Sequence, residues 1–147
     1  MNEPDLRAME EFLHLRIPLT RAMGVRVGPD ATHRFAIEAP VSLNHNHLRT
    51  AFGGSINAVA TLAGYGFLWL ELRETAHVVI ADSSIRFLRP INEMIRAICL
   101  PPRDPDWREF RATFQEKGKA RVSLRVSVEE KGISAAEFEG LFFAIAN

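Results

Sequence analysis

The chain has little of what marks a secreted, a nucleic-acid-binding or a membrane-spanning protein. Its single cysteine excludes an internal disulfide framework and gives no argument for secretion. Its 18 basic and 18 acidic side chains give a formal net charge of zero, so no overall field favours nucleic acid or an anionic membrane. The longest apolar run is too short to cross a bilayer. Because the acidic stretch from Met1 to Asp5 lacks the apolar segment of a signal peptide, we expect a cytoplasmic protein.

Length and composition indicate one ordinary folded domain. The chain has 147 residues, of which 47% are hydrophobic. This is enough for a hydrophobic core that needs no disulfide or metal to stabilise it. The sequence contains no internal repeat or flexible linker, so we expect a single domain over residues 1–147.

The segment Asn46–Asn57, which contains the pair Gly53-Gly54, is the most informative part of the chain. An apolar stretch from Ala58 to Leu70 follows it, and we expect one long buried helix from about Gly54 to Arg73. The N–H groups at the start of a helix have no partner within the helix, so they can bind a carbonyl oxygen or a developing oxyanion. Glycines there allow a ligand to approach the backbone closely.

Most of the remaining chain alternates in the manner of strands. Residues 5–16 form a second helical pattern, with apolar side chains on one face, and Pro18 breaks it. Short turns favour antiparallel pairing, so we expect a meander of strands that curls around the apolar helix. Apolar surface left at the sheet edge would favour a dimer. The alternation predicts strands over residues 25–27, 33–39, 77–88, 94–100, 108–116, 120–128 and 134–146.

Several separate blocks of the chain carry a resemblance to known proteins. These blocks are Ile17–Thr20, Met23–Val25, Thr50–Ser55, Ala60–Gly64, Ile80–Ser83 and Ile85–Pro90. In this order the blocks resemble sequences of proteins with the hotdog fold. They resemble most closely the putative thioesterase family whose domain is sometimes fused to an acetyltransferase. The resemblance implies an α+β fold, in which a five- to six-stranded antiparallel sheet wraps one long central helix, plus a short N-terminal helix. It also implies an acyl-thioester hydrolase that needs no cofactor and works as a homodimer or a dimer of dimers.

The resemblance extends to part of a catalytic motif. Many hotdog acyl-CoA thioesterases carry His-Gly-Gly, with an asparagine before it and a carboxylate after it on the helix. Gly53 and Gly54 match the glycines, and Asn46 matches the asparagine, which implies that a glycine N–H polarises the thioester carbonyl and that Asn46 orients water or the thioester. Phe52 stands at the histidine position and Thr61 at the carboxylate position. An alcohol is a poor base at neutral pH, so the usual carboxylate has no counterpart here.

Three polar residues form a stripe along one face of the apolar helix. Asn57 and Thr61 lie four residues apart, with Gly54 about one turn earlier and Tyr65 one turn later. A polar group buried without a partner costs about 1–3 kcal/mol. The stripe is therefore either paired across a subunit contact or used on a ligand. The candidate substrate-binding residues are Phe52, Ser55, Asn57, Tyr65 and Ser84.

Asp82 is the candidate for the missing base. It follows an apolar run, where burial would raise the pKa of a carboxylate and suit it to base chemistry. Help from a general base is worth about 10²–10⁴-fold in rate. The structural alternatives are an Asp82 satisfied at a strand bend and an Asn46 that forms a turn. The candidate catalytic residues are Asn46, Gly53, Gly54, Thr61 and Asp82.

The leading hypothesis is hydrolysis of an acyl thioester of coenzyme A or of acyl carrier protein. The first alternative is a non-catalytic domain that binds acyl thioesters, which the missing helix carboxylate favours. The second is a hotdog dehydratase or hydratase, which needs an Asp/His pair near the helix start. His45 and His47 lie there as a His-x-His pair, but no third ligand is evident in the sequence, so we expect no metal site.

Overall fold

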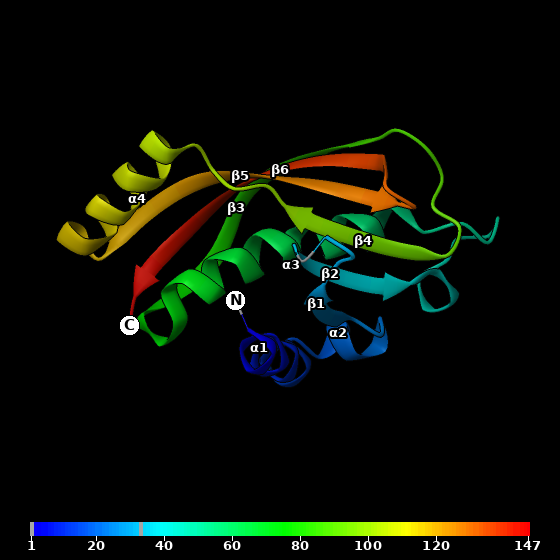
Figure 1. Ribbon diagram of the computed structural model, residues 1–147, viewed down its shortest axis with the longest axis horizontal. Helices are drawn as coiled ribbons and strands as arrows, with labels where there is room; N and C mark the ends of the chain where they lie inside the picture. Colours follow the sequence, from blue (N-terminus) through cyan, green and yellow to red (C-terminus); the bar gives the residue numbers. More distant parts are fainter. Residues whose placement is uncertain (1, 33) are drawn as a thin grey trace.

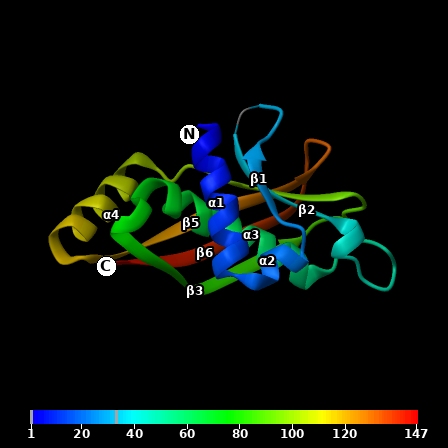
Figure 2. The same ribbon diagram turned by 90° about the horizontal axis from the view of Figure 1, so that it is seen from below.

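A long helix lies against the concave face of an antiparallel sheet (Figure 1). This computed structural model describes residues 2–32 and 34–147. The central helix, α3, spans Gly53–Leu72, which confirms the predicted helix. Because α3 is apolar on most sides, it must be covered by other elements on two opposite sides. The sheet covers one side, and helix α1 crosses the other (Figure 2). Its buried residues are Ile56, Val59, Ala60, Leu62, Ala63, Gly64, Gly66, Leu68 and Leu72.

Six antiparallel strands form the sheet, in the spatial order β1-β2-β4-β5-β6-β3. This confirms the predicted α+β hotdog fold with its wrapped helix. The predicted start of one strand at His33 lies outside the described residues. The strands are β1 (Arg26–Pro29), β2 (Phe35–Pro40), β3 (Ala76–Phe87), β4 (Met94–Cys99), β5 (Lys119–Glu130) and β6 (Ile133–Ala146).

Strand β3 departs from the expected meander. It pairs with β6 instead of with β4, the next strand along the chain, and therefore forms an edge of the sheet. The connection from β3 to β4 crosses the ends of β6 and β5. Leu88 N donates to Ala135 O (2.8 Å), and the Glu130 carboxylate accepts the backbone N–H groups of Asn92 and Glu93. These bonds fix the crossing segment, which sequence alternation alone does not reveal.

The predicted strand over residues 108–116 is wrong, because these residues belong to helix α4, Asp104–Lys117. Alternation of Phe110 and Phe114 suggested a strand. Together with Trp107, however, these residues recur at spacings of three and four, which is the pattern of one helix face. Acidic residues and a proline in the first turn also favour a helix.

Helix α4 covers the part of β5 that β4 leaves unpaired. β4 pairs with residues 126–129 of β5, and α4 packs against β5 at the other end of that strand (Figure 1). The predicted turn at Lys117–Lys119 is the end of this helix, where Gly118 has a φ of +68°.

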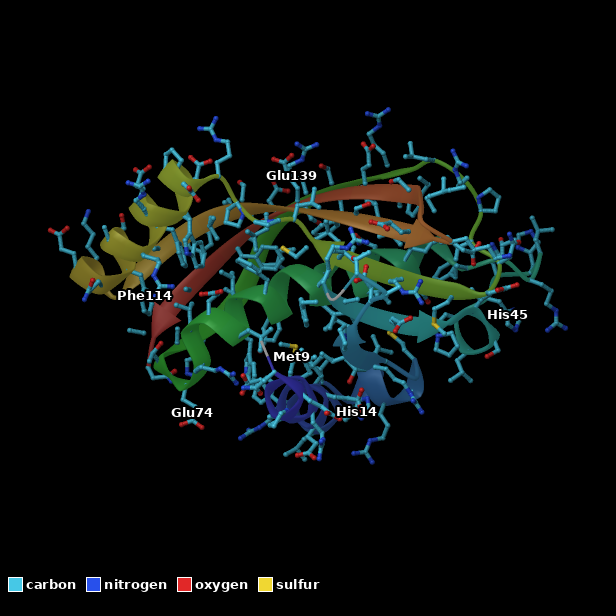
Figure 3. All side chains as sticks on the ribbon, viewed as in Figure 1. Met9, His14, His45, Glu74, Phe114 and Glu139 are labelled. Atoms are coloured by element: carbon cyan, nitrogen blue, oxygen red, sulfur yellow. The ribbon has the colours of Figure 1, made fainter. Side chains whose placement is uncertain are left out.

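The N-terminal helices close the remaining side of α3. Helix α1, Glu3–Arg16, begins at Asn2, whose side-chain oxygen accepts the backbone N–H of Asp5 (2.9 Å). Met9 is fully buried and points from α1 toward α3 (Figure 3). No helix within residues 2–32 and 34–147 combines the length and the apolar character needed to cross a membrane. The other helical segments are α2 (Pro18–Ala22) and the 3-10 helices η1 (Val41–Leu43) and η2 (Arg73–Thr75).

Candidate functional site

The start of α3 presents backbone N–H groups that the helix itself does not use. Ile56 N makes the first intrahelical bond, to Phe52 O (3.0 Å). Within the described residues, no side chain caps this end, and the N-cap position is occupied by Phe52 in place of a Ser, Thr, Asp or Asn. The N–H groups of Gly53, Gly54 and Ser55 are therefore free to bind an external acceptor.

Two phenylalanine rings flank these N–H groups. A Cβ added at Gly53 would lie 3.3 Å from Cζ of Phe87, and a Cβ added at Gly54 would lie 2.6 Å from Cε2 of Phe52. Both rings are half-exposed, at 54% for Phe87 and 55% for Phe52. The glycines thus let aromatic side chains approach the helix start. Sequence reasoning missed Phe87, although it lies in the 85–90 block that carries the family resemblance.

The segment before α3 is held in place by buried hydrogen bonds. Asn44 is buried, and its Nδ2 donates to Met23 O (2.9 Å) and Pro40 O (2.8 Å). The backbone oxygen of Asn44 accepts Phe52 N (2.8 Å), and Ala51 N donates to the oxygen of Ile91, in the crossing segment (2.9 Å). The position of the helix start is therefore fixed from two directions.

Asn46 organises the loop between these anchors. Its Oδ1 accepts the N–H groups of Leu48 (2.9 Å) and Thr50 (3.2 Å), and its Nδ2 donates to Thr50 Oγ1 (2.9 Å). The turn that these bonds close contains Arg49, whose φ of 67° is in the left-handed region. Because its side-chain oxygen accepts these two backbone N–H groups, Asn46 stabilises a turn, which is the structural alternative that the sequence left open. Its action on water stays a prediction.

The predicted polar stripe is present on α3, where Asn57, Thr61 and Tyr65 are all half-buried. Thr61 Oγ1 donates to the backbone oxygen of Asn57 (2.9 Å). Burial raises the pKa of the Tyr65 hydroxyl, so Tyr65 stays a neutral donor at physiological pH. The sequence of α3 contains a single carboxylate, Glu71 near its far end, which pairs with Arg111 (3.4 Å). The stripe therefore carries hydrogen-bonding groups but no anionic base.

A β-bulge in β3 changes the orientation of Asp82 and Ser84. Ile80 pairs with Phe142, a buried inner-face residue of β6, but the register shifts between Ile80 and Asp82. Asp82 consequently pairs with Leu141, whereas Ser83 takes the inner-face position opposite Gly140. Without the extra residue, strict alternation would have placed Asp82 and Ser84 on the inner face.

The two β3 candidates thus lie on the outer face of the sheet, away from α3. Ser84 pairs with Glu139, which projects from that outer face (Figure 3). Asp82 is exposed, and its Oδ1 accepts the backbone N–H of Ser83 (2.9 Å). The expectation that Asp82 is enclosed by apolar residues is wrong for the single chain. In the single chain both residues therefore lie on the face of the sheet opposite α3, and their catalytic and binding roles stay predictions.

The His-x-His pair lies in the loop before the helix. His45 Nδ1 contacts Asn46 O (2.8 Å) and its Nε2 lies 3.5 Å from Arg49 Nη1, while His47 is exposed. His45 lies at the end of the molecule opposite Phe114 of α4 (Figure 3). In the part of the chain that the structure describes, no three His, Cys, Asp or Glu side chains are grouped to hold a metal ion.

Solved structures of other proteins share this fold. A putative thioesterase from Shewanella oneidensis is 27% identical with a TM-score of 0.84, and the match covers 97% of this chain and 98% of that one. A protein of unknown function from Chlorobaculum tepidum TLS is 26% identical with a TM-score of 0.85, over 96% and 94% of the two chains. A Bacillus halodurans protein solved with CoA is 19% identical with a TM-score of 0.69, over 88% and 79%.

A family of sequences also matches almost the entire chain. Its description is "Putative thioesterase (yiiD_Cterm)", and it matches residues 6–146. The match spans most of α1, the whole sheet and the glycine-led start of α3. The protein therefore belongs to this thioesterase family, as the sequence blocks predicted.

Proposed function

We propose that the protein hydrolyses acyl thioesters at the start of α3. The observation that carries this proposal is the set of uncapped N–H groups at Gly53, Gly54 and Ser55, between the rings of Phe52 and Phe87, in a chain of a thioesterase family. Amide donors fixed at the end of a helix are the groups that stabilise an oxyanion in acyl transfer.

The proposed reaction follows from this geometry. The thioester carbonyl oxygen accepts hydrogen bonds from the amides of Gly53 and Gly54, which draws electron density from the carbonyl carbon. Water adds to that carbon, the C–S bond breaks, and the thiol leaves with the bonding electrons and a proton. The half-exposed rings of Phe52 and Phe87 pack against the acyl chain where it enters the apolar region beside α3.

The proposed substrate is an acyl ester of coenzyme A or of acyl carrier protein. The Bacillus halodurans protein that was solved with CoA has the same fold, which supports a CoA thioester. The assay described below distinguishes the two carriers and measures the preferred length of the acyl chain. The cytoplasmic location, the single domain and the lack of nucleic-acid and membrane partners stay predictions.

We further propose a homodimer that forms through strand β3. This strand is 12 residues long, lies at the sheet edge and is exposed along most of its length. Its exposed apolar residues include Val79, Ile80 and Phe87, with Leu88 directly after it. A long apolar edge with unpaired N–H and C=O groups is suited to pairing with a second copy. Sedimentation equilibrium that gives a monomer at micromolar concentration would count against the dimer. That two such dimers pair to form a tetramer is a separate prediction.

A non-catalytic role is the second candidate, and one observation favours it. The helix supplies no anionic base, because Glu71 lies far from the glycines and pairs with Arg111. A domain that binds acyl thioesters needs only the amides and the apolar surface.

One assay separates these candidates. Purified protein is incubated with acyl-CoA and acyl carrier protein thioesters of increasing chain length, and free thiol is measured. Thiol release above the uncatalysed rate is the expected result. Tight binding without thiol release would replace the enzyme with a binding domain, and hydration of an enoyl thioester would indicate a hydratase.

A further inference from the structure

Asn57 carries a buried oxygen to which no group in the described residues donates a hydrogen bond. The side chain is half-buried on α3, and its Oδ1 is the sole buried side-chain nitrogen or oxygen without a partner among residues 2–32 and 34–147. Asn44 provides the contrast within the same protein, because its Nδ2 donates to two backbone oxygens. Asn44 is therefore held by the fold, whereas the oxygen of Asn57 is not.

A buried acceptor without a donor destabilises a fold, and almost all such groups in folded proteins are hydrogen-bonded. An apolar side chain of the same shape would be more stable at this position. The donor to Asn57 Oδ1 must therefore come from outside the described chain. It is a water molecule, a ligand or a second copy of the chain.

The location of Asn57 favours a donor that takes part in chemistry. Asn57 lies one helical turn beyond Gly53, about 6 Å along the helix axis. Asn57 therefore lies on the same helix face as Gly53, one turn from the amides that would bind the carbonyl oxygen.

Thr61 offers the same kind of group on the next turn. Its hydroxyl proton is given to the backbone oxygen of Asn57 (2.9 Å), so to any further partner Thr61 offers only oxygen lone pairs. Asn57 Oδ1 and Thr61 Oγ1 are therefore two acceptors on one helix face. A water molecule has two protons to donate and satisfies both.

We propose that Asn57 Oδ1, together with Thr61 Oγ1, positions the water that attacks the thioester. This inference rests on the proposed hydrolysis at the start of α3. With both protons of the water directed at these acceptors, its lone pair faces the carbonyl carbon. The pair of oxygens aligns the nucleophile by geometry alone, without a carboxylate.

The proton balance of this step needs no outside base. The water oxygen forms a bond to the carbonyl carbon, and the carbonyl π electrons move to the oxygen held by the glycine amides. When they return, the C–S bond breaks and the sulfur takes the bonding pair. One water proton stays on the new carboxylic acid, and the other is lost to bulk water, which in turn protonates the departing thiolate. The products are one carboxylic acid and one thiol.

The test compares Asn57→Leu with Asn44→Leu in the full-length chain. For Asn57→Leu we expect kcat to fall at least tenfold, KM to change less than twofold, and the melting temperature to stay the same or rise. For Asn44→Leu we expect the melting temperature to fall, because partnered buried groups are lost. If Asn57→Leu lowers the melting temperature as Asn44→Leu does, its partner is structural and the inference fails. It also fails if Asn57→Leu retains its kcat.

A pH profile provides a second readout that a structural role would not affect. We expect wild-type kcat to be flat between pH 5 and 7, and Asn57→Asp to acquire a rise with pH as its carboxyl ionises. A wild-type profile that already rises through this range would overturn the inference by revealing a carboxylate base elsewhere. Absence of thiol release by the wild type is a different result, since it would remove the proposed hydrolase itself.

Discussion

The two ends of α3 are built in opposite ways. At the C-terminal end, aromatic side chains close around the helix: Trp69 packs on Phe12 (5.5 Å between ring centroids) and Phe67 on Trp107 (5.4 Å). Arg73 lies over the Trp69 ring. At the N-terminal end the amides are uncapped, the flanking phenylalanines are half-exposed, and one buried oxygen has no partner in the described chain. One end holds the helix in the fold, and the other leaves hydrogen-bonding groups for a ligand.

This difference separates stability from activity along a single helix. Uncapped amides and an unpartnered acceptor lower stability, and the aromatic packing at the other end offsets that loss. Substitutions near the closed end should therefore change stability with little effect on turnover. Substitutions at the open end should do the reverse.

The largest expected effect on stability lies where α3 meets the sheet. A Cβ added at Gly64 would lie 2.5 Å from Cζ of Phe142, which is fully buried. We expect Gly64→Val to destabilise the protein by about 3 kcal/mol, because neither the helix nor the ring can move freely. Urea denaturation checks this. An unchanged unfolding midpoint would show that the packing between helix and sheet is looser than described.

A smaller effect is expected for the aromatic layer at the closed end. Trp107 is half-buried, stacks on Phe110 (5.2 Å) and meets Phe67 edge-on. We expect Trp107→Ala to cost about 2 kcal/mol, or roughly 5 °C in melting temperature. Because this layer is remote from the glycines, kcat should change less than twofold. A large loss of kcat in a variant that stays folded would break the separation of the two ends.

Glu130 should give a pH-dependent effect at the crossing segment that supports the open end. Burial acts to raise its pKa, but the backbone N–H groups of Asn92, Glu93 and Met94 outweigh this and hold the pKa below its ordinary value of 4.5. We expect Glu130→Gln to cost about 1 kcal/mol at pH 7. Because the folded-state pKa is lowered, this stabilisation is present above pH 4.5 and is lost as the pH falls through the lower folded-state pKa.

Melting temperatures of the two proteins across the acid range check this prediction. The difference between wild type and Glu130→Gln should be constant from neutral pH to about pH 5 and should shrink below it. A difference that persists unchanged at about pH 2 would show that the carboxylate acts by shape and not by charge.

The smallest expected effect is on the outer face of the sheet. The sequence predicts at least a tenfold loss of kcat for Asp82→Asn, but the bulge at Ile80/Asp82 directs this side chain away from α3. If the orientation seen in the single chain holds in the assembly, the loss is less than twofold and smaller than that of Thr61→Ala, which removes an acceptor from the polar stripe. Thiol release by both variants provides the measurement. A tenfold loss for Asp82→Asn would restore it as the base, acting across a subunit contact.

The features that the sequence predicted correctly are those set by local pattern. The helix Gly53–Leu72 is apolar on most sides, and strand β5 alternates without interruption, so both were evident. Helix α4 was missed because Phe110 and Phe114 fit both a period of two and a helix face. For a segment with such an ambiguous pattern, the acidic residues and proline in its first turn were the more reliable signal.

The features that the sequence could not give depend on pairing between distant segments. The position of β3 beside β6 depends on the crossing segment, and its bulge reverses the faces of Asp82 and Ser84. No local pattern signals the extra residue. The polar stripe of Asn57, Thr61 and Tyr65 was readable from helical spacing, but the unpartnered oxygen of Asn57 emerges only after every neighbour is in place.

The most direct test of the open end is Gly54→Val, with Gly64→Val as the matched control. Gly54 is exposed, and the ring that its side chain would meet belongs to the half-exposed Phe52, which can move. We therefore expect Gly54→Val to fold with a melting temperature close to that of wild type. Its kcat/KM for thiol release should fall at least about 100-fold, because the branched side chain covers the amides. A folded Gly54→Val with wild-type turnover would contradict the account.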